Sequence, residues 1–111
     1  MSRVIFVNGQ YRDYNKSNIH VEDRGYQFAD GVYEVFTVMN SSIVDYTQHL
    51  DRLYRSLSEL KIKSPISKKT YIFHIKNIIR KNMIDNGTVY LQVTRGVEPR
   101  DFKYSKNIKS S

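Results

Sequence analysis

The sequence has no cysteine, so neither disulfide bonds nor thiolate metal sites are available to it. This absence is compatible with a reducing compartment. Long apolar runs are missing as well, because no stretch approaches the length that crosses a membrane. The apolar run at residues 4–7 is too short for a signal-peptide core and is not followed by a small-residue cleavage site. We therefore expect a cytoplasmic protein without a membrane partner.

Acidic residues are few, 11 against 18 Lys and Arg, which leaves a net charge of +7. Such an excess raises the question of a nucleic-acid partner. Many of the basic residues lie on or beside two predicted helices, where a solvated helix face explains them equally well. The predicted strand at residues 32–39 places Tyr33 and Phe36 on opposite faces and has no basic residue, unlike sheets that bind single strands. We expect no nucleic acid as a partner, and a non-catalytic basic binding module is kept as an alternative.

The chain length of 111 residues and the apolar share of 40% indicate one globular domain with a core. Asn8-Gly9 is a strong hairpin signal because both residues accept positive φ. Residues 22–30, with mixed charge and glycine, are expected to form a structured loop. β-prone runs between turn signals predict strands at residues 3–7, 10–14, 19–21, 32–39, 43–46 and 88–94.

Two helices are predicted between the last two strands, from apolar residues at helical spacing. Thr47 is the expected N-cap of the first helix, which Ser64-Pro65 ends. Ser67 is the expected N-cap of the second, which Asn86-Gly87 ends. The element order predicts an α+β fold, an antiparallel sheet with two helices packed on it. The apolar stripes are Leu50, Leu53, Tyr54, Leu57 and Leu60 in the first helix, and Tyr71, Ile75, Ile78, Ile79 and Met83 in the second.

Four ordered segments carry a resemblance to a known family. Residues 22–35, EDRGYQFADGVYEV, resemble the signature near the start of D-amino-acid transaminases. HLDRL at 49–53, YLQVTRG at 90–96 and Pro99-Arg100 follow in the family order. The chain thus resembles the N-terminal domain of a fold-type IV (class IV) aminotransferase that depends on pyridoxal 5'-phosphate (PLP), and is most similar to D-alanine transaminases.

The resemblance implies a reaction, a cofactor and partners. The intact enzyme would transfer an amino group between a D-amino acid such as D-alanine and a 2-oxo acid, using pyridoxal 5'-phosphate. Residues 1–100 would form the N-terminal domain of the D-amino-acid aminotransferase-like fold, and residues 101–111 would begin a frayed interdomain linker. The expected partners are a second copy of the chain, as a homo-oligomer, or a missing C-terminal half.

Two arginines match family positions that bind anions. Arg52 matches the arginine that holds the cofactor phosphate, a role suited to the planar, permanently charged guanidinium. The competing interpretation is a surface arginine that pairs with Asp51 or Glu59. Arg100 matches the arginine that receives the substrate carboxylate. Its competing interpretation is an ordinary arginine at the start of a basic tail.

Two residues of the predicted strand 32–39 match the family's substrate pocket. Tyr33 matches a tyrosine that lines the pocket and donates to the substrate carboxylate. Val35, two residues further on, lies on the same face of the strand. The competing interpretations are a cross-strand aromatic packing partner for Tyr33 and a plain core residue for Val35.

The sequence departs from the family pattern just after Arg100. The best-known members have a histidine where this chain has Phe102. A phenyl ring cannot donate a hydrogen bond, and Asp101 beside it would repel a carboxylate. This departure leaves the exact substrate open. A branched-chain aminotransferase or an aminodeoxychorismate lyase of the same fold type therefore remains an alternative.

The remaining charged residues receive supporting roles. His49 is interpreted as a helix-start residue near the site, and Arg24 and Asp30 are expected to brace the signature loop. His20 and His74 have no partner at metal-ligand spacing, so no metal site is expected.

No lysine of the chain lies in a family motif, and the resemblance places both the Schiff-base lysine and the acid beside the pyridine nitrogen beyond residue 111. We therefore expect a chain truncated before the catalytic lysine, with no catalytic residue of its own and no transaminase activity in isolation. The resemblance does not imply that this chain binds the cofactor without the rest of the enzyme.

Overall fold

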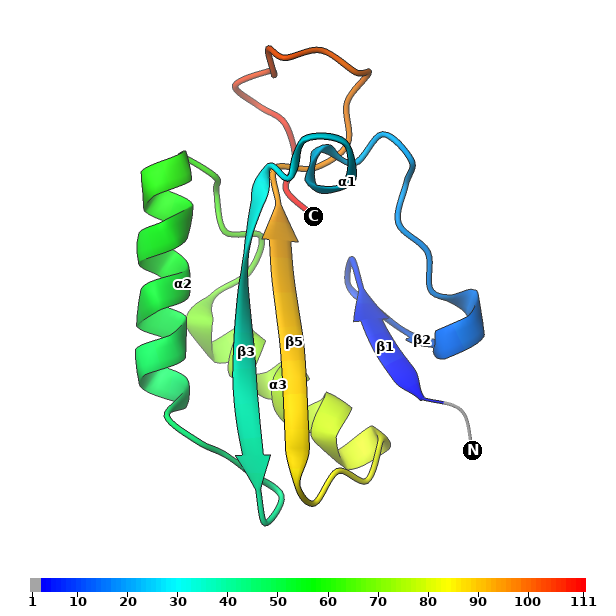
Figure 1. The fold of residues 1–111 in the computed structure, drawn as a ribbon, viewed down its shortest axis with the longest axis vertical. Coiled ribbons are helices and arrows are strands. Elements are labelled where there is room, and N and C mark those ends of the chain that lie inside the picture. The colour runs from blue at the N-terminus through cyan, green and yellow to red at the C-terminus, as the bar shows by residue number, and fades with distance from the viewer. Residues whose placement is uncertain (1–2) are drawn as a thin grey trace.

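The computed structural model describes residues 3–111. It confirms the predicted α+β architecture, with a three-stranded antiparallel sheet in the order β4-β3-β5, a separate hairpin and helices packed against the sheet (Figure 1). The elements are β1 (Val4–Val7), β2 (Gln10–Asp13), a 3-10 helix (Tyr14–Lys16), α1 (Arg24–Phe28), β3 (Gly31–Met39), β4 (Ser42–Ile43), α2 (Tyr46–Leu60), α3 (Lys68–Lys81) and β5 (Gly87–Thr94).

The hairpin of β1 and β2 forms where the Asn-Gly signal predicts it. Val7 pairs with Gln10, so the turn consists of Asn8 and Gly9. Both turn residues have positive φ, 47° and 88°, which the two-residue turn requires.

The two long strands of the main sheet, β3 and β5, pair from Gly31↔Thr94 to Val38↔Gly87, along the whole length of β5. Alternate residues of each strand point to opposite faces. Phe36 and Val38 of β3 and Val93 of β5 are buried, whereas Tyr33 is exposed. The sheet therefore has one core face and one open face, as the alternating pattern of β5 predicts.

The core lies between the sheet and the two long helices. In Figure 1, α2 lies alongside β3 and α3 crosses behind β3 and β5, so the face of the sheet toward the viewer is uncovered. Each fully buried leucine contributes roughly 1.5–3 kcal/mol of burial free energy. The predicted stripes supply most of the core, through Leu50, Leu53 and Leu57 of α2 and Tyr71, Ile75 and Ile79 of α3.

The start of α2 differs from the prediction. The second hairpin strand was expected over 43–46, but β4 has only two residues and α2 begins at Tyr46. Asp45, in left-handed conformation with φ 53°, occupies the N-cap position, so the predicted cap Thr47 lies inside the helix. The chain turns at Asp45 directly after the short β4, which is why the helix begins earlier than expected.

The ends of both long helices also come earlier than predicted. α2 ends at Leu60, which is exposed, and Lys61 closes the helix in left-handed conformation before Ser64-Pro65 is reached. α3 ends at Lys81, because Met83 has positive φ (51°) and takes the chain out of helical conformation. The side chain of Asn82 exchanges hydrogen bonds of 2.8 and 3.0 Å with the backbone of Val4 in β1. Met83 consequently leaves the apolar stripe and is exposed.

The segment between the hairpin and β3 contains two helices that were not expected, the 3-10 helix and α1, and lacks one expected strand. Residues 19–21 form no strand, and the predicted structured loop contains α1. Asp23 Oδ1 accepts a hydrogen bond from Gly25 N at 2.8 Å and caps this helix. Five helical residues are too few to show a helical apolar period, so the pattern could not predict α1.

The segment after Arg100 contains no helix or strand, but it has defined contacts. Ser111 N donates to Thr94 O at 3.2 Å, Thr94 N donates to Ser111 O at 2.8 Å, and Ser110 Oγ donates to Lys63 O. The structure thus packs this segment against the end of β5 instead of leaving it unpaired. Its role as the start of a linker stays a prediction. Within residues 3–111, no helix is long and apolar enough to span a membrane.

Candidate functional site

The open face of the sheet carries two of the predicted site residues. Tyr33 and Val35 both project from it, with exposed fractions of 63% and 40%. Tyr33 stacks on Tyr90 of β5 with ring centroids 5.6 Å apart, and Tyr90 Oη donates to Gln92 Oε1 at 3.1 Å. The cross-strand packing expected as the alternative for Tyr33 is therefore present. Its phenol nevertheless stays at the surface, where it can meet a ligand.

Arg52 is held by a buried carboxylate that the sequence interpretation did not single out. Arg52 Nε donates to Glu34 Oε2, and Nη2 donates to Oε1, both at 2.8 Å. His49 Nδ1 lies 2.8 Å from the same Oε1. Within residues 3–111, Nη1 of Arg52 makes no hydrogen bond, and the side chain is 57% exposed. The guanidinium is thus fixed along one edge and free along the other.

This pairing replaces the partners proposed from the sequence. Asp51 pairs with Lys68 at 2.8 Å instead of with Arg52. Glu34 lies on β3, 18 residues before Arg52, and alternates with the exposed Tyr33 and Val35. A charged residue at an inward position of an otherwise apolar strand face is the sequence signal that could have revealed it.

The electrostatics of this pair are mutually stabilising. Hydrogen bonds from Arg52 hold the pKa of Glu34 below its ordinary value, although burial of the carboxyl opposes this, and His49 adds to the effect. In return the Glu34 carboxylate raises the pKa of Arg52. Arg52 therefore stays charged, and Glu34 stays ionised well into the acid range.

Arg100 lies in the loop that follows β5. Its guanidinium lies over the ring of Phe28 at 5.2 Å and over that of Phe102 at 5.7 Å, and the two rings are 5.6 Å apart. Phe102 is therefore an aromatic packing partner at the position where the family has a histidine. Among the contacts of residues 3–111, none joins Arg100 to Tyr33 or Arg52, so the chain alone does not bring all four predicted residues together.

A second ionic group lies behind this loop. Asp30 Oδ2 accepts hydrogen bonds from Arg24 Nε at 2.9 Å and from Arg95 Nε at 2.7 Å. Both arginines are buried, and we call the three residues the Asp30 cluster. Burial raises the pKa of Asp30, but the hydrogen bonds and charges of Arg95 and Arg24 outweigh it, so the pKa lies below its ordinary value. Arg24 and Asp30, which were expected to brace the signature loop, are in direct contact. Arg95 is a further partner of Asp30 that the sequence interpretation missed.

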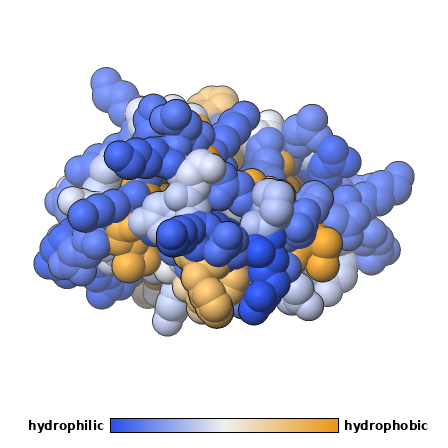
Figure 2. Space-filling view, turned by 90° about the horizontal axis from the view of Figure 1, so that it is seen from above, coloured by the Kyte–Doolittle hydropathy of each residue, from blue (hydrophilic) through white to orange (hydrophobic). Residues whose placement is uncertain are grey.

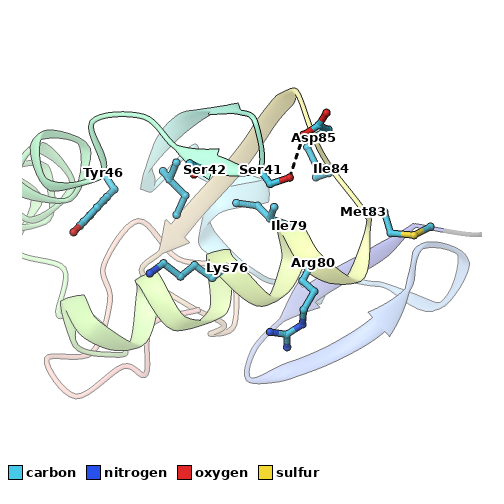
Figure 3. Close-up of a pocket in the computed structure, with 10 residues that line it drawn as sticks. Ser41, Ser42, Tyr46, Lys76, Ile79, Arg80, Met83, Ile84 and Asp85 are labelled. Carbon is cyan, nitrogen blue, oxygen red and sulfur yellow. Dashed lines mark hydrogen bonds between the residues drawn. The ribbon is translucent and has the colours of Figure 1, made fainter.

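Among the surface hollows of residues 3–111, two differ in whether predicted site residues line them. The hollow in Figure 3 lies between β4 and the C-terminal half of α3, and contains none of the predicted site residues. In that view Arg80 points away from it, and Ser41 Oγ donates to Asp85 Oδ1 at 3.2 Å. The other hollow is lined by Arg52 and His49 together with the polar residues Asp45, Gln48, Asp51 and Arg55, at the N-cap and in the first three turns of α2. The free edge of Arg52 thus borders an open, polar depression.

The other two histidines have structural partners. His74 Nδ1 lies 2.5 Å from Tyr11 Oη and its ring stacks on Phe6 with centroids 4.1 Å apart. His20 Nδ1 accepts a hydrogen bond from Glu22 N at 2.9 Å. Among the described residues, no group of three or more His, Asp or Glu is placed to hold a metal ion.

Comparison with known proteins identifies the family. The family model described as amino-transferase class IV matches residues 31–110, which include β3, Arg52 and the loop that carries Arg100. The chain belongs to this family. The D-alanine aminotransferase of Listeria innocua is 44% identical to this chain over 98 residues, covering 87% of this chain and 34% of the relative. The chain spans about a third of the length of the curated relatives that it matches.

Solved structures show the same fold at low sequence identity. The branched-chain amino acid aminotransferase from Escherichia coli has a TM-score of 0.91 at 16% identity, covering 99% of this chain and 39% of that one. The 4-amino-4-deoxychorismate lyase from Pseudomonas aeruginosa has a TM-score of 0.65 at 24% identity, covering 86% and 33%. These similarities establish that the chain has the fold-type IV aminotransferase fold.

Proposed function

We propose that this chain forms the N-terminal domain of a pyridoxal-phosphate-dependent D-amino-acid transaminase. The enzyme would transfer an amino group between a D-alanine-like amino acid and a 2-oxo acid. The observation that carries the proposal is the arginine of the class IV motif, Arg52, held by buried Glu34 with one edge free. The 44% identity with a D-alanine aminotransferase supports the choice of reaction within the family.

The residues present fit the phosphate end of the cofactor. A guanidinium that is fixed along one edge and exposed along the other can donate to phosphate oxygens without reorganising. Glu34 uses Nε and Nη2 of Arg52, which leaves Nη1 for such a contact. When bound, pyridoxal phosphate supplies the electron-accepting ring on which amino-group exchange depends.

The chain's other site residues would bind and orient the substrate. The exposed phenol of Tyr33 can donate a hydrogen bond to a carboxylate, and Val35 beside it offers an apolar wall. Arg100 would attract the same carboxylate by charge. Because Arg100 does not meet Tyr33 within this chain, the proposal includes further protein that completes the site, either a C-terminal half or a second copy. Residues 1–100 as the domain, 101–111 as the start of a linker, and a cytoplasmic location belong to the same proposal.

A second candidate is another fold-type IV activity, on branched-chain amino acids or on aminodeoxychorismate. Phe102 favours it, because its exposed phenyl ring packs on Phe28 and cannot donate to a carboxylate. This difference bears on the substrate and leaves the cofactor contact of Arg52 unchanged.

A chimera tests the proposal. This chain would be joined to the part of the Listeria innocua D-alanine aminotransferase that it does not cover, with the complete relative as positive control. We expect the chimera to transaminate D-alanine with 2-oxoglutarate and the isolated chain to show no turnover. In the chimera, Arg52→Ala should weaken pyridoxal phosphate binding at least about tenfold, because it removes a charge-assisted contact to phosphate.

Arg12→Ala is the matched control, since Arg12 is an exposed arginine of β2 that lines neither of the two hollows described above. It should leave cofactor affinity unchanged. Equal affinities for the Arg52 and Arg12 variants would exclude the phosphate role. A chimera that accepts L-leucine or aminodeoxychorismate in preference to D-alanine would favour the second candidate.

A further inference from the structure

We propose that Arg24 is a positioning residue that holds the loop of residues 100–104 and thereby sets the place of Arg100. The function of Arg100 as a carboxylate ligand rests on the proposed function, whereas the positioning itself can be measured without any ligand. Figure 1 shows this loop above α1, at the end of the sheet where β3 begins and β5 ends. Figure 2 views that end directly and shows it covered mainly by hydrophilic side chains.

All three nitrogens of the Arg24 guanidinium are engaged. Nε donates to Asp30, Nη1 donates to Asp101 O at 2.5 Å, and Nη2 donates to Phe102 O at 3.3 Å. The residue is 5% exposed. Two of its donors therefore bind backbone carbonyls of residues that directly follow Arg100, although Arg24 precedes them by more than 70 positions in the chain.

Arg24 is itself fixed by the rest of the Asp30 cluster. Asp30 binds Arg24 and Arg95 together, and Arg95 donates to Leu60 O at 2.7 Å and to Lys61 O at 3.1 Å at the end of α2. A cation at the C-terminal end of a helix is favourably placed. A continuous set of charged contacts thus connects the end of α2 to the loop.

Aromatic rings complete the arrangement around Arg100. The guanidiniums of Arg24 and Arg100 both lie over Phe28, at 4.6 and 5.2 Å from its centroid. Tyr104 lies beneath Arg95 at 3.7 Å and Arg24 at 5.2 Å. Cations over aromatic faces are attracted by the ring quadrupole. The loop is therefore held at Asp101 and Phe102 by hydrogen bonds and at Tyr104 by stacking, and Arg100 stands directly before these anchors.

Arg24→Lys tests this role. A lysine can keep the ion pair with Asp30, but its single ammonium cannot also reach both carbonyls in the fork geometry of arginine. We expect trypsin to cleave after Arg100 and Lys103 about tenfold faster or more, because local opening of the loop becomes easier. The Arg100 side-chain proton resonances, shifted by the rings of Phe28 and Phe102, should move toward their random-coil positions. The unfolding temperature should change little.

Arg55→Lys is the matched control and should leave both the cleavage rate and the Arg100 resonances unchanged.

Arg24→Met is the second variant, because it removes the buried charge at similar volume and leaves Asp30 paired with Arg95. A folded variant of either kind with wild-type cleavage rates and wild-type Arg100 resonances would overturn the proposal. Should neither variant fold, hydrogen exchange on the unmutated chain decides: protected Arg24 Nη hydrogens support the proposal, and freely exchanging ones refute it. None of these readouts involves cofactor or substrate, so this inference and the proposed function can fail separately.

Discussion

Glu34 is a buried carboxylate on a strand whose neighbouring residues face away from the core. Its charge is retained because Arg52 and His49 both contact its oxygens. A carboxyl whose pKa is lowered in the folded state stabilises that state when ionised. The contribution is complete above the unfolded pKa of about 4.3 and is lost as the pH falls through the lower folded value.

Glu34→Gln should therefore lower the free energy of unfolding near pH 7, and the difference from the unmutated chain should shrink as the pH falls below about 4. Urea unfolding at a series of pH values measures this. The acid dependence that remains in the variant is assigned to Asp30, whose pKa is also lowered. Asp51→Asn removes an exposed carboxylate that pairs with Lys68 at the surface, and should change stability little at any pH. Parallel pH curves for Glu34→Gln and the unmutated chain would contradict this account.

At the scale of elements, α1 is placed by its close approach to β5. A Cβ at Gly25 would lie 2.2 Å from Thr94 Cγ2 and 2.9 Å from Thr94 Cβ. Only glycine lets the short helix come this near to the strand. The approach in turn lets Arg24 N donate to Gly96 O at 2.8 Å and brings the Asp30 cluster together.

Gly25→Ala should destabilise the chain by about 1–3 kcal/mol, because overpacking at this contact outweighs the better helix propensity of alanine. Thr94→Ser removes the Cγ2 methyl group but keeps the hydroxyl that accepts from Gly96 N. In that background the loss caused by Gly25→Ala should be smaller, since the contact with Thr94 Cγ2 is gone and only the longer contacts with Thr94 Cβ and Asp23 Oδ1 remain. A double-mutant cycle by chemical denaturation measures the coupling. Additive effects would show that Thr94 does not set the helix position.

At the scale of the whole molecule, the main sheet is covered on one side only. Tyr33, Val35, Met39 and Tyr90 are large side chains on its open face, with exposed fractions between 40% and 63%. Exposed apolar and aromatic side chains gathered on one face of a sheet indicate a surface that other protein covers. β3 and β5 contain no Lys or Arg, so the positive charge of the chain lies elsewhere, and the open face does not have the composition of a nucleic-acid-binding sheet.

We expect the isolated chain to self-associate through this face as its concentration rises. Tyr90→Lys should weaken the association by about tenfold or more, because a charge would have to be desolvated in the contact. Phe73→Lys, at a comparably exposed residue of α3, is the control and should leave association unchanged. Sedimentation velocity over a concentration series provides the measurement. A monomer at every concentration, or equal effects of the two substitutions, would contradict the prediction.

Local sequence patterns were sufficient to predict the elements with a clear period and the family motifs. The alternation of β5, the apolar stripes of the two long helices and the Asn8-Gly9 turn all follow from local patterns, because burial of one face repeats every two or 3.6 residues. The same patterns could not predict α1, which is too short to show a period. They also misplaced the helix ends, where single residues such as Asn82 bind distant backbone.

Which charged side chains come into contact depends on how the elements pack in three dimensions. Glu34 and Arg52 are 18 residues apart, and Asp30 and Arg95 are 65 apart. The periodicity of apolar residues shows which face of an element a residue occupies. The charged side chain that it contacts depends on how strands and helices pack together. For the same reason the motifs predicted Arg52 and Arg100 as anion ligands, whereas their positions depend on Glu34 and on the Asp30 cluster, and folding brings those contacts together.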